Sequence, residues 1–224
     1  MPNPRGLPLS EAVRFGWKTV QSSFAFILLT LVVAAIVPSI IEWGGEHVFH
    51  HDGQVFLIKV ISCLVSATFG LGLSKIYLRF RDGEKPIFEN LFDGVARAHI
   101  WFASTLIATV AILMGLVLLV VPGIIMMLRL WMVGFVLVDE RTGPIDAIQR
   151  SWDITRGHTM DLLVFFIALL GLNILGAVCL LVGLFVTIPI SGLAMAYVYR
   201  ELKPKTVMVA TPAPAPTSNA APAV

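Results

Sequence analysis

The sequence predicts an all-α polytopic membrane protein with about six transmembrane helices arranged as three hairpins. Five apolar runs cover 23–41, 54–78, 100–121, 123–138 and 162–199, and the last is long enough for two crossings. About 20 mainly apolar residues cross the hydrocarbon core as a helix, and the chain lacks the alternating segments of a membrane barrel. Composition agrees, because 57% of the residues are hydrophobic and only 13% are charged, against roughly 25% charged in soluble domains.

One domain is expected to account for nearly the whole chain. Six crossings leave no room for a separate soluble catalytic domain, so we expect a single transmembrane domain over 1–203. Residues 204–224 are rich in Ala and Pro and show no apolar periodicity, which predicts a disordered cytoplasmic tail. The net charge of +2 is too small to indicate nucleic acid as a partner.

Cationic residues indicate how the crossings are oriented. Lys and Arg accumulate in cytoplasmic loops, and alternating the crossings from a cytoplasmic N-terminus places almost all cations inside. This inner set is Arg5, Arg14, Lys18, Lys75, Arg79, Arg81, Lys85, Arg97, Arg141, Arg150, Arg156, Arg200, Lys203 and Lys205. Only Lys59 and Arg129 do not fit it, so the expected topology is six helices with both termini in the cytoplasm.

Three inner segments share a short pattern. Residues 12–17, 90–95 and 147–152 each combine a small or polar residue, an aliphatic residue, Gly or Ser, and a large apolar residue, and each follows a proline. Proline suits the first turn of a helix, and the apolar spacing predicts a short amphipathic cytoplasmic helix before each hairpin. The alternative is that three helix starts resemble one another by coincidence.

A longer pattern in the last third of the chain resembles a known group of proteins. Its elements are Val121-Pro122-Gly123-Ile124, Arg129-Leu130, Leu137-Val138-Asp139-Glu140, Gly143-Pro144, Ala147-Ile148, Arg150-Ser151-Trp152 and Thr155-Arg156-Gly157. Residues 121–202 thereby resemble uncharacterised bacterial multi-pass proteins, including the membrane domain of glycerophosphoryl diester phosphodiesterase-like proteins. The resemblance implies a polytopic protein of the bacterial inner (cytoplasmic) membrane. The phosphodiesterase activity belongs to a separate barrel domain, which no segment here supplies.

Histidines in the outer connection are the weak candidates for a metal site. On a helix His47, His50 and His51 would share one face at a spacing that suits zinc or copper. The alternative is a solvated polar loop, which Gly44, Gly45 and Gly53 favour because glycine weakens a helix. We therefore expect no bound metal and no cofactor.

Arg129 is an ionisable residue inside an apolar run. Such a residue costs about 2.5–3.5 kcal/mol at mid-membrane and marks a functional pathway or a specific structural partner. No predicted crossing contains Asp or Glu to pair with it. We expect a structural or lipid-contacting role, with the side chain extending toward outer headgroups near Pro122.

No complete catalytic signature appears in the sequence. Inner-segment acids and a histidine are candidates for acid–base chemistry but follow no known catalytic spacing; they are Asp139, Glu140, Asp153, His158 and Asp161. We therefore expect a non-enzymatic, lipid-associated scaffold or a partner of a membrane complex, associating with lipids, other membrane proteins or itself. The alternative is a small carrier or channel, for which the polar candidates are Arg129, Asn173, Ser104, Thr105, Thr109 and Ser191.

Overall fold

Helices make up the regular structure of the described part of the chain. The computed structural model describes residues 7–48, 52–118, 120–179 and 183–203. In chain order the elements are α1 (Leu9–Ser22), α2 (Phe24–Val48), α3 (Asp52–Arg81), the 3-10 turns η1 (Phe88–Leu91) and η2 (Val95–Arg97), α4 (Ala98–Leu118), α5 (Val120–Leu130), α6 (Val133–Asp139), α7 (Pro144–Thr155), α8 (Thr159–Val178) and α9 (Leu184–Leu202). The predicted all-α class is confirmed for these residues. The proposed tail at 204–224 lies outside them.

Four of the described helices are long and apolar enough to cross a membrane. Their candidate spans are Phe24–Gly45, Leu57–Arg81, Ala98–Leu116 and Thr159–Val178. The run predicted as a single crossing at 123–138 is instead divided between α5 and α6, which are 11 and 7 residues long and meet at a turn. The 19 residues of α9 contain Pro189.

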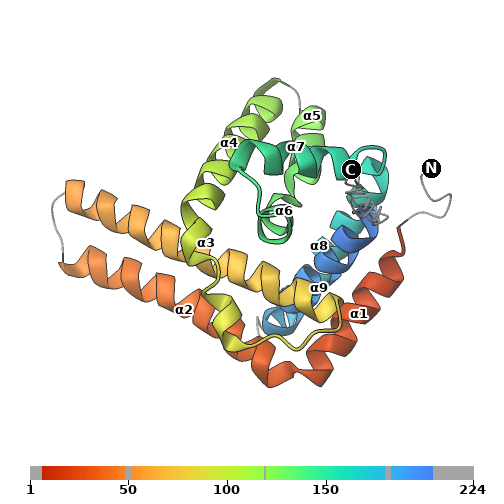
Figure 1. Cartoon of the computed structure of the whole chain (residues 1–224), viewed down its shortest axis with the longest axis horizontal. Coiled ribbons are helices and arrows are strands. Elements are labelled where there is room, and N and C mark those ends of the chain that lie inside the picture. The colour runs from red at the N-terminus through yellow and green to blue at the C-terminus, as the bar shows by residue number, and fades with distance from the viewer. Residues whose placement is uncertain (1–6, 49–51, 119, 180–182, 204–224) are drawn as a thin grey trace, which may run out of the picture.

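Three pairs of consecutive helices are in contact, whereas the predicted six crossings in three hairpins stay a prediction. The pairs α2–α3, α4–α5 and α8–α9 are each in contact, and Figure 1 shows α4 and α5 rising at a steep angle from the α2–α3 pair. The N-terminal helix α1 packs most extensively on α9, the last helix. A Cβ atom on Gly16 would lie 2.7 Å from the backbone oxygen of Ile190, so α1 and α9 approach closely enough to require glycine there.

Two of the three inner segments form the predicted amphipathic helices, α1 and α7. The middle segment differs, because η1 and η2 replace a continuous α-helix. Asn90 explains the difference: its side chain accepts a hydrogen bond from the Ile87 amide at 3.0 Å and donates one to Asp93 at 3.1 Å. Such local bonds compete with helical backbone bonds. The segment also presses onto α3, where a Cβ atom on Gly72 would lie 2.1 Å from the Leu91 oxygen.

The most buried large side chains come from α3, η1, α6, α8 and α9 and from the turn before α6. Large side chains there are almost inaccessible, including Ile76, Leu91, Met132, Leu137, Leu162, Phe165, Leu193 and Tyr199. The rings of Phe135 and Tyr199 stack with centroids 5.7 Å apart, which joins α6 to α9. Large apolar side chains are exposed along the long helices, among them Ile36, Leu57, Leu113 and Ile174. An exposed apolar surface of this kind suits lipid better than water.

Candidate functional site

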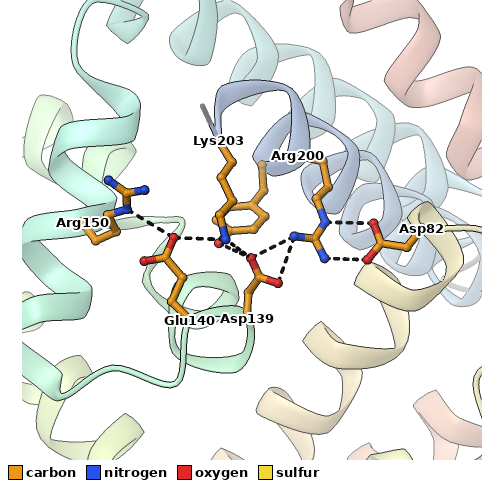
Figure 2. Close-up of polar contacts among 7 residues, drawn as sticks. Asp82, Asp139, Glu140, Arg150, Arg200 and Lys203 are labelled. Carbon is orange, nitrogen blue, oxygen red and sulfur yellow. Dashed lines mark hydrogen bonds and ion pairs between the residues drawn. The ribbon is translucent and has the colours of Figure 1, made fainter. Parts of the chain in front are cut away.

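Charged residues from four segments meet at one place, which we call the inner charge cluster. It comprises Asp82, Asp139, Glu140, Arg150, Arg200 and Lys203, shown in Figure 2 with the hydrogen bonds and ion pairs that connect them. Asp82 follows α3, the two acids at 139 and 140 end α6, Arg150 belongs to α7, and the remaining two cations end α9. The cluster therefore ties together the ends of helices that are far apart in sequence.

Asp139 is at the centre of the cluster, and its side chain is 15% exposed. Its carboxylate accepts hydrogen bonds from the Tyr199 hydroxyl at 2.9 Å, from Nη1 of Arg200 at 2.8 and 2.9 Å, and from Nζ of Lys203 at 2.5 Å. Burial by itself would raise the pKa of Asp139, but the hydrogen bond from Lys203, the charge of Arg200 and the hydrogen bond from Tyr199 hold that pKa below its usual value. The carboxylate is thus kept ionised.

The cations of the cluster are shared between acids. Arg200 also donates to Asp82, from Nε to Oδ1 at 2.9 Å and from Nη2 to Oδ2 at 2.5 Å, which is a bidentate pair. Nζ of Lys203 lies 3.2 Å from Oε1 of Glu140, and Nε of Arg150 donates to the same oxygen at 3.2 Å. Every acid in the cluster therefore has a cationic partner, an arrangement that holds helices together and leaves no free base.

Beside the cluster, a second set of contacts fixes α1 to the same helix ends. Nη2 of Arg81 donates to Oε1 of Glu201 at 2.9 Å, and its guanidinium carbon lies 4.2 Å from the ring centroid of Tyr197. The Tyr197 hydroxyl donates to Glu11 of α1 at 3.1 Å. Together these contacts place α1, α3 and α9 in a single polar assembly.

The structure separates the five residues considered for acid–base chemistry. Asp139 and Glu140 belong to the inner charge cluster. His158 and Asp161 face each other at 3.2 Å at the start of α8, and Asp153 is exposed on α7. Sequence reasoning found the two acids at 139 and 140 but missed their cationic partners Arg150, Arg200 and Lys203, and it missed Asp82, which shares Arg200. Arg200 directly follows an apolar run, and Asp82 and Lys203 each lie a few residues beyond one, which is the signal that was available.

Arg129 lies at the C-terminal end of α5, against inner segments. Its guanidinium carbon is 4.4 Å from the ring centroid of Trp152 on α7, and Nη2 donates to Oγ1 of Thr159 at 3.4 Å. The Ser151 hydroxyl donates to the Arg129 backbone oxygen at 2.6 Å. The expected extension toward the turn near Pro122 is not observed, because the guanidinium instead contacts the Trp152 ring on α7 and Thr159 at the start of α8. A structural or lipid-contacting role stays a prediction.

The outer histidines are only partly described. His47 is exposed, its Nδ1 lies 2.8 Å from the Trp43 backbone oxygen, and its ring is 4.5 Å from the Trp43 ring centroid. His50 and His51 lie outside the described residues, so the three-histidine site is not tested. Within the described ranges no group of three His, Cys, Asp or Glu residues is placed to hold a metal ion.

A cavity of about 690 Å³ opens between α3, α4, α8 and α9, beside the turn that joins α5 to α6. Four of the polar residues considered for a carrier line it: Thr105, Thr109, Asn173 and Ser191. The other two are placed elsewhere, since Ser104 is fully buried and donates to the Ile100 oxygen at 2.9 Å, and Arg129 contacts α7. The structure therefore brings together most, but not all, of that set.

Comparison with known proteins identifies one family. Residues 55–224 match a family described as a domain of unknown function (DUF7847). No curated protein and no solved structure matches the chain, so the resemblance to the membrane domain of glycerophosphoryl diester phosphodiesterase-like proteins stays a prediction. The matched region runs from α3 to the C-terminus and includes the inner charge cluster and the cavity. Because it covers well over half of the sequence, the chain belongs to the DUF7847 family.

Proposed function

We propose that the protein crosses the bacterial inner membrane six times, with both termini in the cytoplasm, and acts as a non-enzymatic, lipid-associated scaffold or partner of a membrane complex. The inner charge cluster carries this proposal. Its acids and cations pair with one another between helix ends, as a structural anchor requires. A catalytic or conducting site would instead keep free charges facing a ligand. The exposed apolar side chains along the long helices supply the lipid-contacting surface.

The position of the cluster also supports six crossings. If α5 and α6 together form the fourth crossing and α9 the sixth, then the second, fourth and sixth crossings must all end on the same side. Asp82, Asp139 and Arg200 stand at those three ends and are in direct contact. The cluster contains Arg and Lys, as expected for the cytoplasmic side.

Single cysteines test the topology in a background lacking Cys63 and Cys179. Suitable exposed positions are Gln54 near the start of α3, before the candidate span Leu57–Arg81, Glu84 after α3 and Gln149 on α7. Gln54 is preferable to Gly45, since a Cβ atom at Gly45 would lie 2.4 Å from the Ile58 side chain. An impermeant thiol reagent should label Gln54→Cys in intact cells, and the other two only after permeabilisation. Labelling of Glu84→Cys or Gln149→Cys in intact cells would refute the six-crossing arrangement.

A carrier is the second candidate, and the cavity is the observation that favours it. Solute flux into liposomes that contain the purified protein, measured with a panel of solutes, distinguishes a scaffold from a carrier. A scaffold predicts flux no greater than in protein-free liposomes. A carrier predicts solute flux that depends on the protein, is lost in Asn173→Leu and is retained in a lipid-facing variant such as Ile174→Leu. That result would refute the scaffold hypothesis in favour of a carrier.

A further inference from the structure

The cavity has a polar end and an apolar end. Trp101 Nε1 and the Ser74 hydroxyl mark the polar end, because both lie within 4 Å of the position that a Cβ atom on Gly134 would take. Tyr77 is one helical turn beyond Ser74 on α3, and its ring packs against Gly192. Farther along, Ile112, Met127 and Ile188 give the wall an apolar character. Its volume of about 690 Å³ falls within the range of roughly 300–1,000 Å³ typical of small-molecule sites.

The polar end offers hydrogen-bond donors without protein partners. Tyr77 is 7% exposed, and within the described residues its hydroxyl makes no hydrogen bond. The Trp101 indole and the Thr105 hydroxyl are likewise unpaired within the described part of the chain, while the Ser74 hydroxyl donates to the Gly70 oxygen at 2.9 Å. A buried hydroxyl normally has a partner, because leaving it unpaired costs about 1–3 kcal/mol. A tyrosine hydroxyl without a protein partner, on a side chain that is largely buried and lines a cavity, therefore points to a ligand.

The lining also constrains the charge of that ligand. Its residues include no Asp, Glu, Lys or Arg. An ionised headgroup would be desolvated there without a counter-charge, which is strongly unfavourable. A carbonyl or hydroxyl oxygen, in contrast, can accept from Tyr77, Trp101 and Thr105, and a hydrocarbon chain can occupy the apolar end. The surrounding bilayer supplies molecules of this kind.

We propose that the cavity binds one uncharged lipid, with its ester carbonyl or hydroxyl group at Tyr77 and Trp101 and its chain directed toward Ile112 and Ile188. The assignment rests on the proposed placement of these helices in a membrane. Asn173 is held on the cavity wall by its amide nitrogen, which donates to the Leu169 oxygen at 2.8 Å and to the Ser191 hydroxyl at 2.9 Å, while its Oδ1 has no partner within the described residues.

A photoreactive monoacylglycerol with a diazirine in its chain tests the proposal on the purified full chain in nanodiscs. Mass spectrometry should find crosslinks on cavity-lining segments of α4 and α9. Gly134→Leu and Gly70→Leu fill the cavity without forcing the backbone apart, because a Cβ atom at Gly134 meets its neighbours at 3.7 Å or more and one at Gly70 meets nothing within 4 Å. Both variants should lower cavity labelling about tenfold or more, as expected when the ligand's volume is blocked.

Gly171→Leu is the matched control. Gly171 lies on membrane helix α8, outside the cavity lining, and a Cβ atom there also meets nothing within 4 Å. This variant should label like the parent. Cavity labelling that persists at the parent level in both Gly134→Leu and Gly70→Leu would overturn the proposal.

The headgroup is tested separately. Tyr77→Phe removes one hydrogen bond and should weaken competition by unlabelled monoacylglycerol about fivefold, with an unchanged thermal unfolding midpoint showing that the fold is intact. Phosphatidic acid of the same chain length should compete poorly, and equal competition would overturn the uncharged headgroup. Labelling of lipid-facing residues such as Ile36 should persist in every variant. Its absence would refute the membrane placement, whereas its presence without cavity labelling would refute only the lipid site.

Discussion

Asp139→Asn is the sharpest test of the inner charge cluster as the element that joins the helices. The substitution preserves side-chain volume but removes the negative charge that accepts from Tyr199, Arg200 and Lys203. Removing one partner of a buried charge pair costs about 3–5 kcal/mol when the other charge is left alone. Here Arg200 retains Asp82 and Lys203 retains Glu140, and an amide oxygen still accepts one bond. We therefore expect a smaller loss of stability, of about 2 kcal/mol.

The assay is thermal unfolding of the purified chain in one defined detergent at neutral pH. For a chain of this size about 2 kcal/mol lowers the unfolding midpoint by about 4–8 °C. Asp153→Asn is the control, because Asp153 is an exposed acid on α7 outside the cluster. It should change stability by less than about 0.5 kcal/mol. An Asp139→Asn midpoint indistinguishable from that of Asp153→Asn would refute the structural role of the cluster.

The double variant Asp82→Asn/Asp139→Asn makes the test stricter. Each single change leaves Arg200 with one carboxylate, but the double change removes both acids to which it donates. Neighbours that share a partner couple by about 0.5–3 kcal/mol. The loss in the double variant should exceed the sum of the single losses, and simple additivity would show that Arg200 does not link the two acids.

Three further outcomes follow from the same geometry. The folded-state pKa of Asp139 lies below its unfolded value of about 3.9. The stabilisation that the ionised Asp139 gives the folded state is therefore complete above that pH and is lost as the pH falls through the lowered pKa. The thermal unfolding midpoint should consequently fall less steeply with decreasing pH in Asp139→Asn than in the parent. Ser151→Ala removes the fully buried hydroxyl that donates to the Arg129 oxygen and should cost about 1–2 kcal/mol by thermal unfolding, whereas a cost near zero would mean that the bond does not support α5. Gly72→Ala forces a methyl group onto the Leu91 backbone and should cost about 1–3 kcal/mol, while Gly171→Ala should be neutral or stabilising.

The sequence predicted the features that depend on local composition. Apolar runs place the long helices, and proline followed by an amphipathic pattern places α1 and α7. The break between α5 and α6 could not be predicted in the same way, because Trp131 and Met132 are ordinary apolar residues. The turn there instead accompanies packing of α6 against α3 and α7. Likewise, Asn90 redirects the middle inner segment through side-chain bonds that a pattern of apolar spacing does not register.

The partners of Asp139 were missed for a related reason. Charges next to apolar runs are expected on the cytoplasmic side, but their positions along the chain do not say which of them meet. Arg200 is 61 residues from Asp139 and 118 from Asp82. Both α6 and α9 pack on α3, and the Phe135 and Tyr199 rings stack between them, which brings these groups within hydrogen-bond distance.

The direction of the helix pairs explains why such a cluster is needed. The α2–α3 and α4–α5 pairs diverge in Figure 1, so they share little surface at their outer ends. Within lipid, apolar helices gain no hydrophobic free energy by associating, and close packing or polar contacts must supply it. Close packing occurs where Gly192 admits the Tyr77 ring and Gly72 admits Leu91, and both positions lie toward the inner charge cluster. Removing two acids of the cluster, as in Asp82→Asn/Asp139→Asn, should therefore separate the helix pairs from one another while the helices within each pair stay in contact. Disulfide crosslinks between cysteines placed on α3 and α9 should then be lost before crosslinks between α2 and α3.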